Sequence, residues 1–235
     1  MKMINASMGS LEENVASELN DNRSTVRSVV AVAVALWFGL VLFLGAQGAF
    51  VGSADSPPLP IFFGFAIPLV VFFAAYFGWS EFRAFVLSTD LRLVAAMQAW
   101  RWAGFGFLAL YAHGVLPGLF AFPAGLGDMA IGLTAPWILL GLARHPSFAA
   151  SPRYVLWNIM GITDLVVAVS LGAICSGFLH GLTGNVTTSP MAKLPLVLIP
   201  AYFVPIFIML HFTALSQARR LARSGKTAPT QNTQT

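Results

Sequence analysis

The stretches PAGLGDMAIGLTAP, Pro123–Pro136, and GITDLVVAVSLG, Gly161–Gly172, each place one aspartate inside an apolar segment. The residues around the two aspartates recur with similar spacing: Gly125, Asp128, Gly132 and Pro136 in the first stretch, and Gly161, Asp164, Ala168 and Gly172 in the second. Steps of three and four residues keep each set on one helix face, so the pattern predicts adjacent helices whose aspartates face protein rather than lipid. An ionisable group in hydrocarbon costs at least about 2.5 to 3.5 kcal/mol on insertion scales, which makes both aspartates candidate functional residues.

Composition extends this prediction to the whole chain. Of 235 residues, 57% are hydrophobic and 9% charged, whereas an ordinary globular domain has about 25% charged residues. Six segments approach or exceed the roughly 20 residues that cross a bilayer: 28–51, 59–79, 96–117, 122–143, 154–177 and 194–215. We therefore predict an all-α polytopic membrane protein with six transmembrane helices in one bundle, residues 28–216. The flanking predictions are a polar cytoplasmic segment, 1–27, and a basic, then Thr/Gln-rich, disordered cytoplasmic tail, 217–235.

The basic charges predict the orientation of the chain. Short cytoplasmic loops of membrane proteins carry an excess of Lys and Arg. With the N-terminus inside, eleven basic residues fall inside: Lys2, Arg23, Arg27, Arg83, Arg92, Arg144, Arg153, Arg219, Arg220, Arg223 and Lys226. Arg101 then lies within a span near its inner end, and Lys193 alone falls outside. Both termini are predicted to be cytoplasmic, and the net charge of +4 is explained without a nucleic-acid partner.

Intramembrane polar residues form two predicted tiers. Counting about 1.5 Å per residue from the span ends places Asp164 near the midplane and Asp128 about 9 Å from the outer edge. The outer tier contains Gln47, His113 and Asp128. The inner tier is made of four residues: Gln98, Arg101, Asn158 and His211.

Two pairings follow from these depths, and each has two interpretations. Arg101 lies about 8 Å in depth from Asp164, within side-chain reach, and the pair is either a charge switch that opens during transport or a permanent ion pair that fixes helix packing. His113 with Asp128 is either an outward-facing proton or cation site, or a hydrogen-bonded histidine beside a carboxylate in a water-filled vestibule.

Several functional classes lack their required residues. No span contains the mid-membrane lysine of a retinal protein, and His113 and His211 lie at opposite ends of the membrane, which argues against a bis-histidine haem. HExxH, GxSxG and P-loop motifs are absent, and the single cysteine, Cys175, excludes an intramolecular disulfide. We predict no cofactor and no resident metal, and an enzyme is the less favoured interpretation.

The last predicted span carries the one family resemblance. From Leu194 through Pro200, Pro205 and His211 to Leu215, it resembles the final span of a family of small uncharacterised bacterial multi-pass membrane proteins. The resemblance carries no catalytic motif and implies no activity. It implies a bacterial inner-membrane location.

Three functional hypotheses remain from the sequence. The first is a small ion- or proton-linked transporter or channel-like protein in which Asp128 and Asp164 line a polar path with Arg101 as counter-charge. The second is a non-catalytic partner or assembly subunit, whose charges pair with another membrane protein or a second copy. The third is a membrane-embedded metal or redox protein that uses His113 and Asp128.

Overall fold

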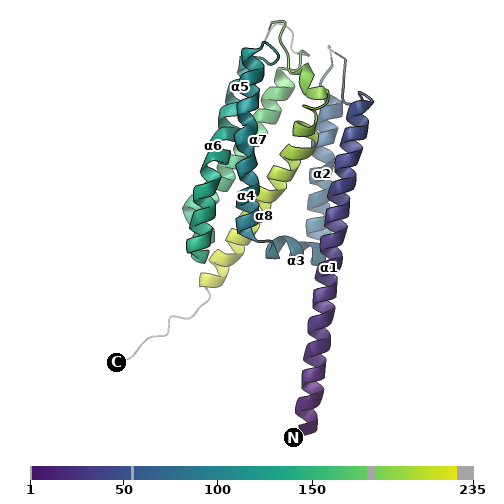
Figure 1. Ribbon diagram of the computed structural model, residues 1–235, viewed down its shortest axis with the longest axis vertical. Coiled ribbons are helices and arrows are strands. Elements are labelled where there is room, and N and C mark those ends of the chain that lie inside the picture. The colour runs from purple at the N-terminus through teal and green to yellow at the C-terminus, as the bar shows by residue number, and fades with distance from the viewer. Residues whose placement is uncertain (1, 54–55, 179–183, 227–235) are drawn as a thin grey trace, which may run out of the picture.

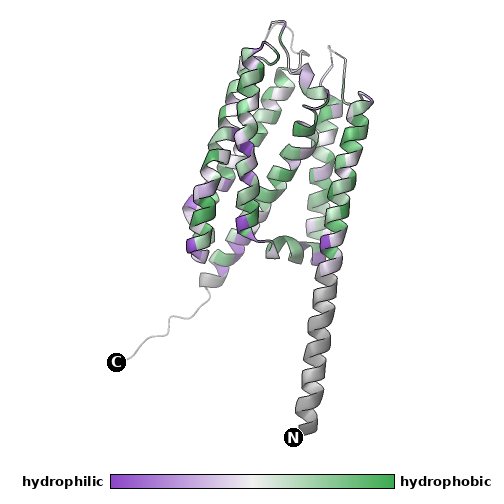
Figure 2. Cartoon of the chain, in the orientation of Figure 1, coloured by the Kyte–Doolittle hydropathy of each residue, from purple (hydrophilic) through white to green (hydrophobic). Residues whose placement is uncertain are grey.

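The computed structural model describes the backbone of residues 2–53, 56–178 and 184–226, and the side chains from residue 24 to residue 223 within those ranges. The described residues form helices and no strand, so the all-α class is confirmed. In the described part of the chain, five helices are long and apolar enough to cross a membrane. Figure 1 shows them as roughly parallel rods, and Figure 2 shows that their surfaces are apolar over most of their length.

The first two long helices stand to one side of the others (Figure 1). Helix α1 runs from Lys2 to Ala46 without interruption, and its part from Ser24 to Ala46 is long and apolar enough to cross a membrane. Helix α2, Leu59–Gly78, begins after prolines that the helix tolerates in its first turn. Short helix α3, Ser80–Ser88, then crosses beneath the bundle toward the third rod (Figure 1).

The third predicted span, 96–117, is not a single helix. Helix α4 covers Leu91–Gln98, the 3₁₀ segment η1 covers Ala99–Gly104 and helix α5 covers Phe105–Ala112. Asp90 begins the rod as N-cap, because its carboxylate accepts a 2.8 Å bond from the backbone N–H of Arg92. Hydrogen bonds from the Arg92 side chain hold the pKa of Asp90 below its ordinary value. The three pieces continue one another as a single rod (Figure 1).

The remaining elements complete the bundle. Helix α6 covers Gly118–Arg144, the 3₁₀ turn η2 covers Pro146–Ala150 and helix α7 covers Pro152–Ile174. A second 3₁₀ turn, η3, Ser189–Ala192, leads to the π-helical segment η4, Ile199–Phe203, and to helix α8, Val204–Lys226. The interruption at η4 contains Pro200 and ends beside Pro205, the two prolines that predicted a break in this span.

Two boundaries at the end of the chain differ from prediction. The last span was placed at 194–215, but regular helical structure begins at Ile199, because the backbone around Pro195 is in turns. The disordered tail is predicted at 217–235, but α8 continues to Lys226. Within this part of α8, the Gln217 side chain donates to the carbonyls of Val86 and Thr89 at 3.0 and 2.8 Å. Residues 227–235 lie outside the described part.

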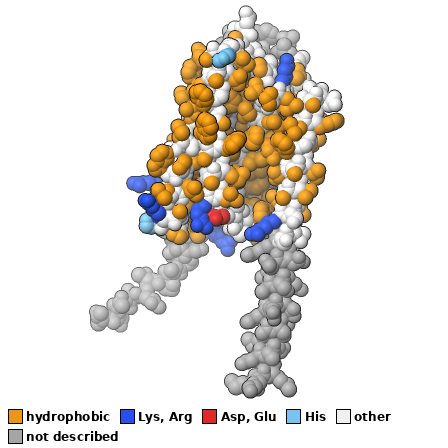
Figure 3. Space-filling model, in the orientation of Figure 1, with side chains coloured by type: hydrophobic (Ala, Val, Ile, Leu, Met, Phe, Trp, Pro, Cys, Tyr) orange, Lys and Arg blue, Asp and Glu red, His pale blue; other side chains and the backbone are white. Residues whose placement is uncertain are grey.

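Apolar packing forms one cluster near each end of the bundle, and we name the end with Tyr154 the inner end and the end with Phe107 the outer end. At one end, Tyr154 packs with Val94, Leu142 and Ala214. At the other end, Phe107 packs with Phe120, Leu116 and Met191. Between the α1–α2 pair and the rest lies an apolar groove of about 1340 Å³, visible as the hollow in the middle of Figure 3.

Candidate functional site

Arg101 is the most deeply buried charged residue in the described part of the chain. Its side chain has an exposed fraction of 0% and projects from η1. Segment η1 lies directly against α6, since a Cβ atom added to Gly132 would fall 2.1 Å from the backbone N of Trp102. The small residue in the α6 strip therefore lets two backbones meet at the level of the arginine.

The Arg101 guanidinium bonds to both intramembrane aspartates. Its Nε donates to Asp128 Oδ1 at 2.7 Å, and its Nη2 donates to Asp164 Oδ2. Its Nη1 donates to the carbonyl of Gly161 at 3.3 Å and lies 3.0 Å from His211 Nε2. The Phe207 ring lies 5.8 Å from the guanidinium carbon. One side chain thus joins η1 to α6, α7 and α8.

The hydrogen bonds determine which nitrogen of His211 carries the proton. Arginine has only donors, so His211 Nε2 accepts from Arg101 and the ring proton resides on Nδ1. Nδ1 lies 2.9 Å from Asn158 Oδ1, which accepts from it, and Asn158 Nδ2 donates to the Tyr154 carbonyl at 2.8 Å. We call Arg101, Asp128, Asp164, His211 and Asn158 the arginine cluster.

The tautomer of His211 is a testable consequence. In the wild type, ¹⁵N NMR of labelled histidine should show the Nδ1–H neutral form at pH 7. Asn158→Leu removes the acceptor for that proton and should destabilise the protein by about 1 to 3 kcal/mol, because a buried donor loses its partner. A protonated His211 ring in the wild type would contradict the bonding pattern. Signals of exposed His113 and His145 supply the internal comparison.

Gln98 is buried but does not join the arginine cluster. Its Nε2 donates to the Phe207 carbonyl at 3.3 Å, and its Oε1 has no protein partner. The sequence assigns it to the same predicted inner tier as Asn158. Its amide nevertheless bonds to α8 backbone rather than to a charge.

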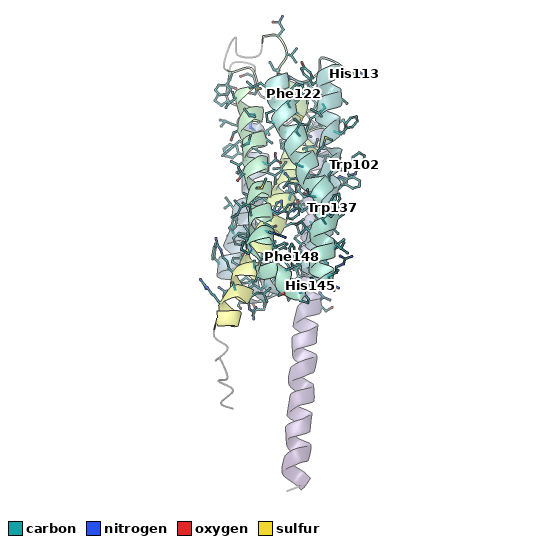
Figure 4. The ribbon with its side chains drawn as sticks, turned by 90° about the vertical axis from the view of Figure 1, so that its left-hand side faces the viewer. Trp102, His113, Phe122, Trp137, His145 and Phe148 are labelled. Carbon is teal, nitrogen blue, oxygen red and sulfur yellow. The ribbon has the colours of Figure 1, made fainter. Side chains whose placement is uncertain are left out.

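The predicted pairing of His113 with Asp128 is wrong. His113 is exposed at the outer end of α5, where its Nδ1 lies 3.1 Å from the Ala109 carbonyl (Figure 4). Asp128 is bound to Arg101 instead. Counting residues from the span ends had separated Asp128 from Arg101. Such a count takes no account of the close contact between Gly104 and Gly125, which brings η1 and α6 together beside Asp128.

Gly127 is a site residue that the sequence interpretation did not single out. An added Cβ atom there would lie 1.6 Å from Asp164 Oδ1, so the missing side chain makes room for the carboxylate from α7. The signal that could have found it is the doublet Gly125 and Gly127 immediately before Asp128. The repeat analysis used only one of these glycines.

Charge in the arginine cluster does not balance. With His211 neutral, a single guanidinium faces two carboxylates, so the cluster carries one net negative charge when both are ionised. The side chains of Asp128 and Asp164 retain exposed fractions of 16% and 14%. Within the described residues, no group of three or more His, Cys, Asp or Glu side chains is arranged to hold a metal ion.

An outer cavity of about 230 Å³ leads to Asp128. Its lining includes Ser53, Thr188 and Lys193 from the outer loops, and Leu165 and Val204 deeper in the bundle. Asp128 is the one acidic residue among the described residues that line it. The cavity therefore connects the outer surface to one carboxylate of the arginine cluster.

Comparison with known proteins places the chain in a family. A family model described as a domain of unknown function, DUF8737, matches residues 58–219. The chain belongs to the DUF8737 family. The matched region begins one residue before α2 and contains every member of the arginine cluster, whereas α1 precedes it. An uncharacterised family was the sequence-based prediction, and this is confirmed. The comparisons with curated proteins and with solved structures gave no match.

Proposed function

We propose that this member of the DUF8737 family is a small transporter or channel-like membrane protein that moves a proton or a small cation through the arginine cluster. The observation that carries the proposal is the excess of one carboxylate over guanidinium at a buried site joined to an outer cavity. A cluster whose only role was to hold helices together would need one carboxylate and one guanidinium, which form a neutral pair.

Six crossings with both termini cytoplasmic form part of this proposal. The rod of α4, η1 and α5 rises about 1.5 Å per α-helical residue and about 2.0 Å per 3₁₀ residue, which gives about 36 Å over residues 91–112, enough to cross about 30 Å of hydrocarbon. Lys and Arg side chains gather at the lower end of the bundle in Figure 3, with one near the upper end. The positive-inside rule makes the lower end cytoplasmic. The proposal includes a bacterial inner-membrane location, which the resemblance of the last span supports.

The charge imbalance gives the cluster a reason to bind and release a cation. An uncompensated negative charge is costly in a low-dielectric interior. One proton on either aspartate, or one monovalent cation beside Asp128, makes the cluster neutral. Arg101 bonds to both carboxylates, so it can strengthen its contact with whichever one remains ionised. Loading at Asp128 is thereby linked to the state of Asp164.

Packing closes the path on the opposite side. Tyr154, Val94 and Leu142 pack together between the cluster and the inner end, whereas the outer cavity reaches Asp128. The described conformation is therefore an outward-facing one in this proposal. Movement of α7 that parts Tyr154 from Val94 would open the inner route, and this movement requires Arg101 to release its partners on α7.

The experiment is flux into liposomes containing the purified protein and an internal pH dye. Under an imposed membrane potential, the wild type should change the internal pH faster than empty liposomes, or faster in the presence of one member of a cation panel. Asp164→Asn should lower the rate about tenfold or more, because a charge-assisted hydrogen bond contributes about 1.5 to 3 kcal/mol and about 1.4 kcal/mol is a factor of ten in rate. Glu81→Gln, which removes an exposed carboxylate on α3, is the matched control.

Two outcomes would contradict the proposal. The first is a wild-type rate equal to that of empty liposomes across the panel. The second is an Asp164→Asn rate equal to that of Glu81→Gln.

Two observations make the other hypotheses less well supported. Both carboxylates of the cluster bond to Arg101 within the chain, so a partner subunit is not needed to supply their hydrogen bonds. His113 lies apart from Asp128, so the pair proposed for a metal or redox site is not assembled.

A further inference from the structure

The outer cavity combines aromatic walls with one carboxylate. Five phenylalanines contribute to its lining: Phe50, Phe62, Phe65, Phe107 and Phe120. Phe107 and Phe120 hold each other edge to face, with ring centroids 5.3 Å apart, so this wall is packed in place. Aromatic faces attract cations, and a carboxylate at the end of an aromatic pocket adds a hydrogen-bond acceptor for an ammonium group.

Among the described residues that line the cavity, the two charged side chains have opposite signs and different positions. Lys193 is an exposed residue of the outer loop that follows η3, whereas Asp128 is mostly buried. The other cation at the cluster, Arg101, lies behind Asp128 with a fully buried side chain. A ligand that enters the cavity therefore meets negative charge in its interior, and an anionic group there would be repelled.

One polar group in the wall has no protein partner. The hydroxyl of Ser176 is buried and makes no hydrogen bond, whereas the nearby Thr188 hydroxyl donates to the Gly172 carbonyl at 2.6 Å. Both residues line the cavity. The Ser176 oxygen can accept a hydrogen bond from an N–H or from water inside the cavity. The volume of about 230 Å³ lies below the roughly 300 to 1,000 Å³ of drug-sized pockets, which limits the ligand to a small molecule.

We propose that the outer cavity binds a small organic cation, a primary ammonium with a short apolar chain, whose nitrogen bonds to Asp128. This inference deepens the proposed function and rests on it, because it names the class of cation that exchanges with the proton at the cluster. The ammonium donates to a carboxylate oxygen as the carboxyl proton leaves through the cavity to outer water. One positive charge replaces another, so the cluster stays neutral.

The test is calorimetric titration of the full-length protein in detergent with n-butylammonium. n-Butanol and butyrate are the neutral and anionic analogues of the same chain. Butylammonium should bind at least about tenfold more tightly than either analogue, a difference of about 1.4 kcal/mol. Titrations in two buffers of different ionisation enthalpy should reveal proton release, and the affinity should weaken as the pH is lowered. Equal heats from the three compounds, or tighter binding of butyrate, would overturn the proposal.

Variants distinguish loss of the binding site from a general effect on the protein. Asp128→Asn should weaken butylammonium binding about tenfold or more, whereas Lys193→Ala should leave it unchanged or strengthen it. Should Asp128→Asn fail to fold, Ala168→Leu provides a second test: it adds bulk to the cavity lining without changing any residue of the arginine cluster, and it should weaken binding too. Retained binding in Ala168→Leu, or a loss in Lys193→Ala as large as in Asp128→Asn, would contradict the site.

The liposome assay distinguishes failure of this inference from failure of the proposed function. Flux that depends on Asp164 but is insensitive to butylammonium at millimolar concentration would overturn the inference and leave the function standing. Butylammonium binding that depends on Asp128, in a protein without flux, would overturn transport and leave the binding site standing.

Discussion

Arg101→Ala is expected to destabilise the protein by about 3 to 5 kcal/mol or more, because it removes the partner of two buried carboxylates at once. Arg101 also supplies bonds to the Gly161 carbonyl and to His211, so four elements lose a shared contact. Cys175 provides the measurement. It is the sole cysteine and has an exposed fraction of 1%, so a thiol-reactive fluorophore reports unfolding during heating in detergent. The midpoint of Arg101→Ala should fall well below that of the wild type.

Companion variants test the cause of that loss. Arg101→Lys keeps the charge but lacks the planar fork that reaches two carboxylates, so its midpoint should lie between those of the wild type and Arg101→Ala. A triple variant, Arg101→Met with Asp128→Leu and Asp164→Leu, removes every charge together and should recover much of the stability. A wild-type midpoint for Arg101→Ala would show that the guanidinium does not hold the bundle together.

Gly132→Ala is expected to have the second largest effect. The added Cβ would lie 2.1 Å from the backbone N of Trp102 and 2.7 Å from the Arg101 carbonyl carbon. Backbone atoms cannot rotate away, so α6 must separate from η1, which should cost about 1 to 3 kcal/mol or more as overpacking. The separation should also displace Arg101 from Asp128, so both the midpoint reported by Cys175 and the flux should fall.

Gly106→Ala is the matched control for this prediction. Gly106 lies in α5, where an added Cβ meets nothing within 4 Å. Alanine is the better helix former by about 0.8 to 1.0 kcal/mol, so this variant should be as stable as the wild type or more so. If Gly106→Ala and Gly132→Ala shift the midpoint equally, the contact between η1 and α6 is not the reason for the glycine at position 132.

The helix faces and the counter-charge could be predicted from the sequence because they follow from local spacing. Steps of three and four residues placed Asp128 with Gly125 and Gly132 on one strip, and that strip does face protein. Arg101 was expected near Asp164 because the two residues differ by about 8 Å in depth, and the ion pair is present. Patterns confined to one helix survive folding when the helix is long and regular.

The second carboxylate contact of Arg101 could not be predicted in the same way. Depth was counted at a constant rise from span ends, but the third rod changes to 3₁₀ geometry at η1, the segment that carries Arg101. A span end also shifts when turns replace helix, as at residues 194–197 before η4. Such interruptions depend on contacts between helices. The contact of Gly104 with Gly125 and Asp128 is one of them, and it has no signature within either helix alone.

The bonding of Arg101 restricts how the bundle can move. Its partners are Asp128 on α6, Asp164 and the Gly161 carbonyl on α7, and His211 on α8, while the arginine itself belongs to η1. Hydrogen bonds of this kind tolerate displacements of only a few tenths of an ångström around about 2.9 Å. If one helix slides alone, its hydrogen bond to Arg101 therefore breaks and the other helices do not follow it. Motions that keep these bonds carry η1, α6, α7 and α8 together as a rigid body, and α1 and α2 are left as the elements against which that body can rock.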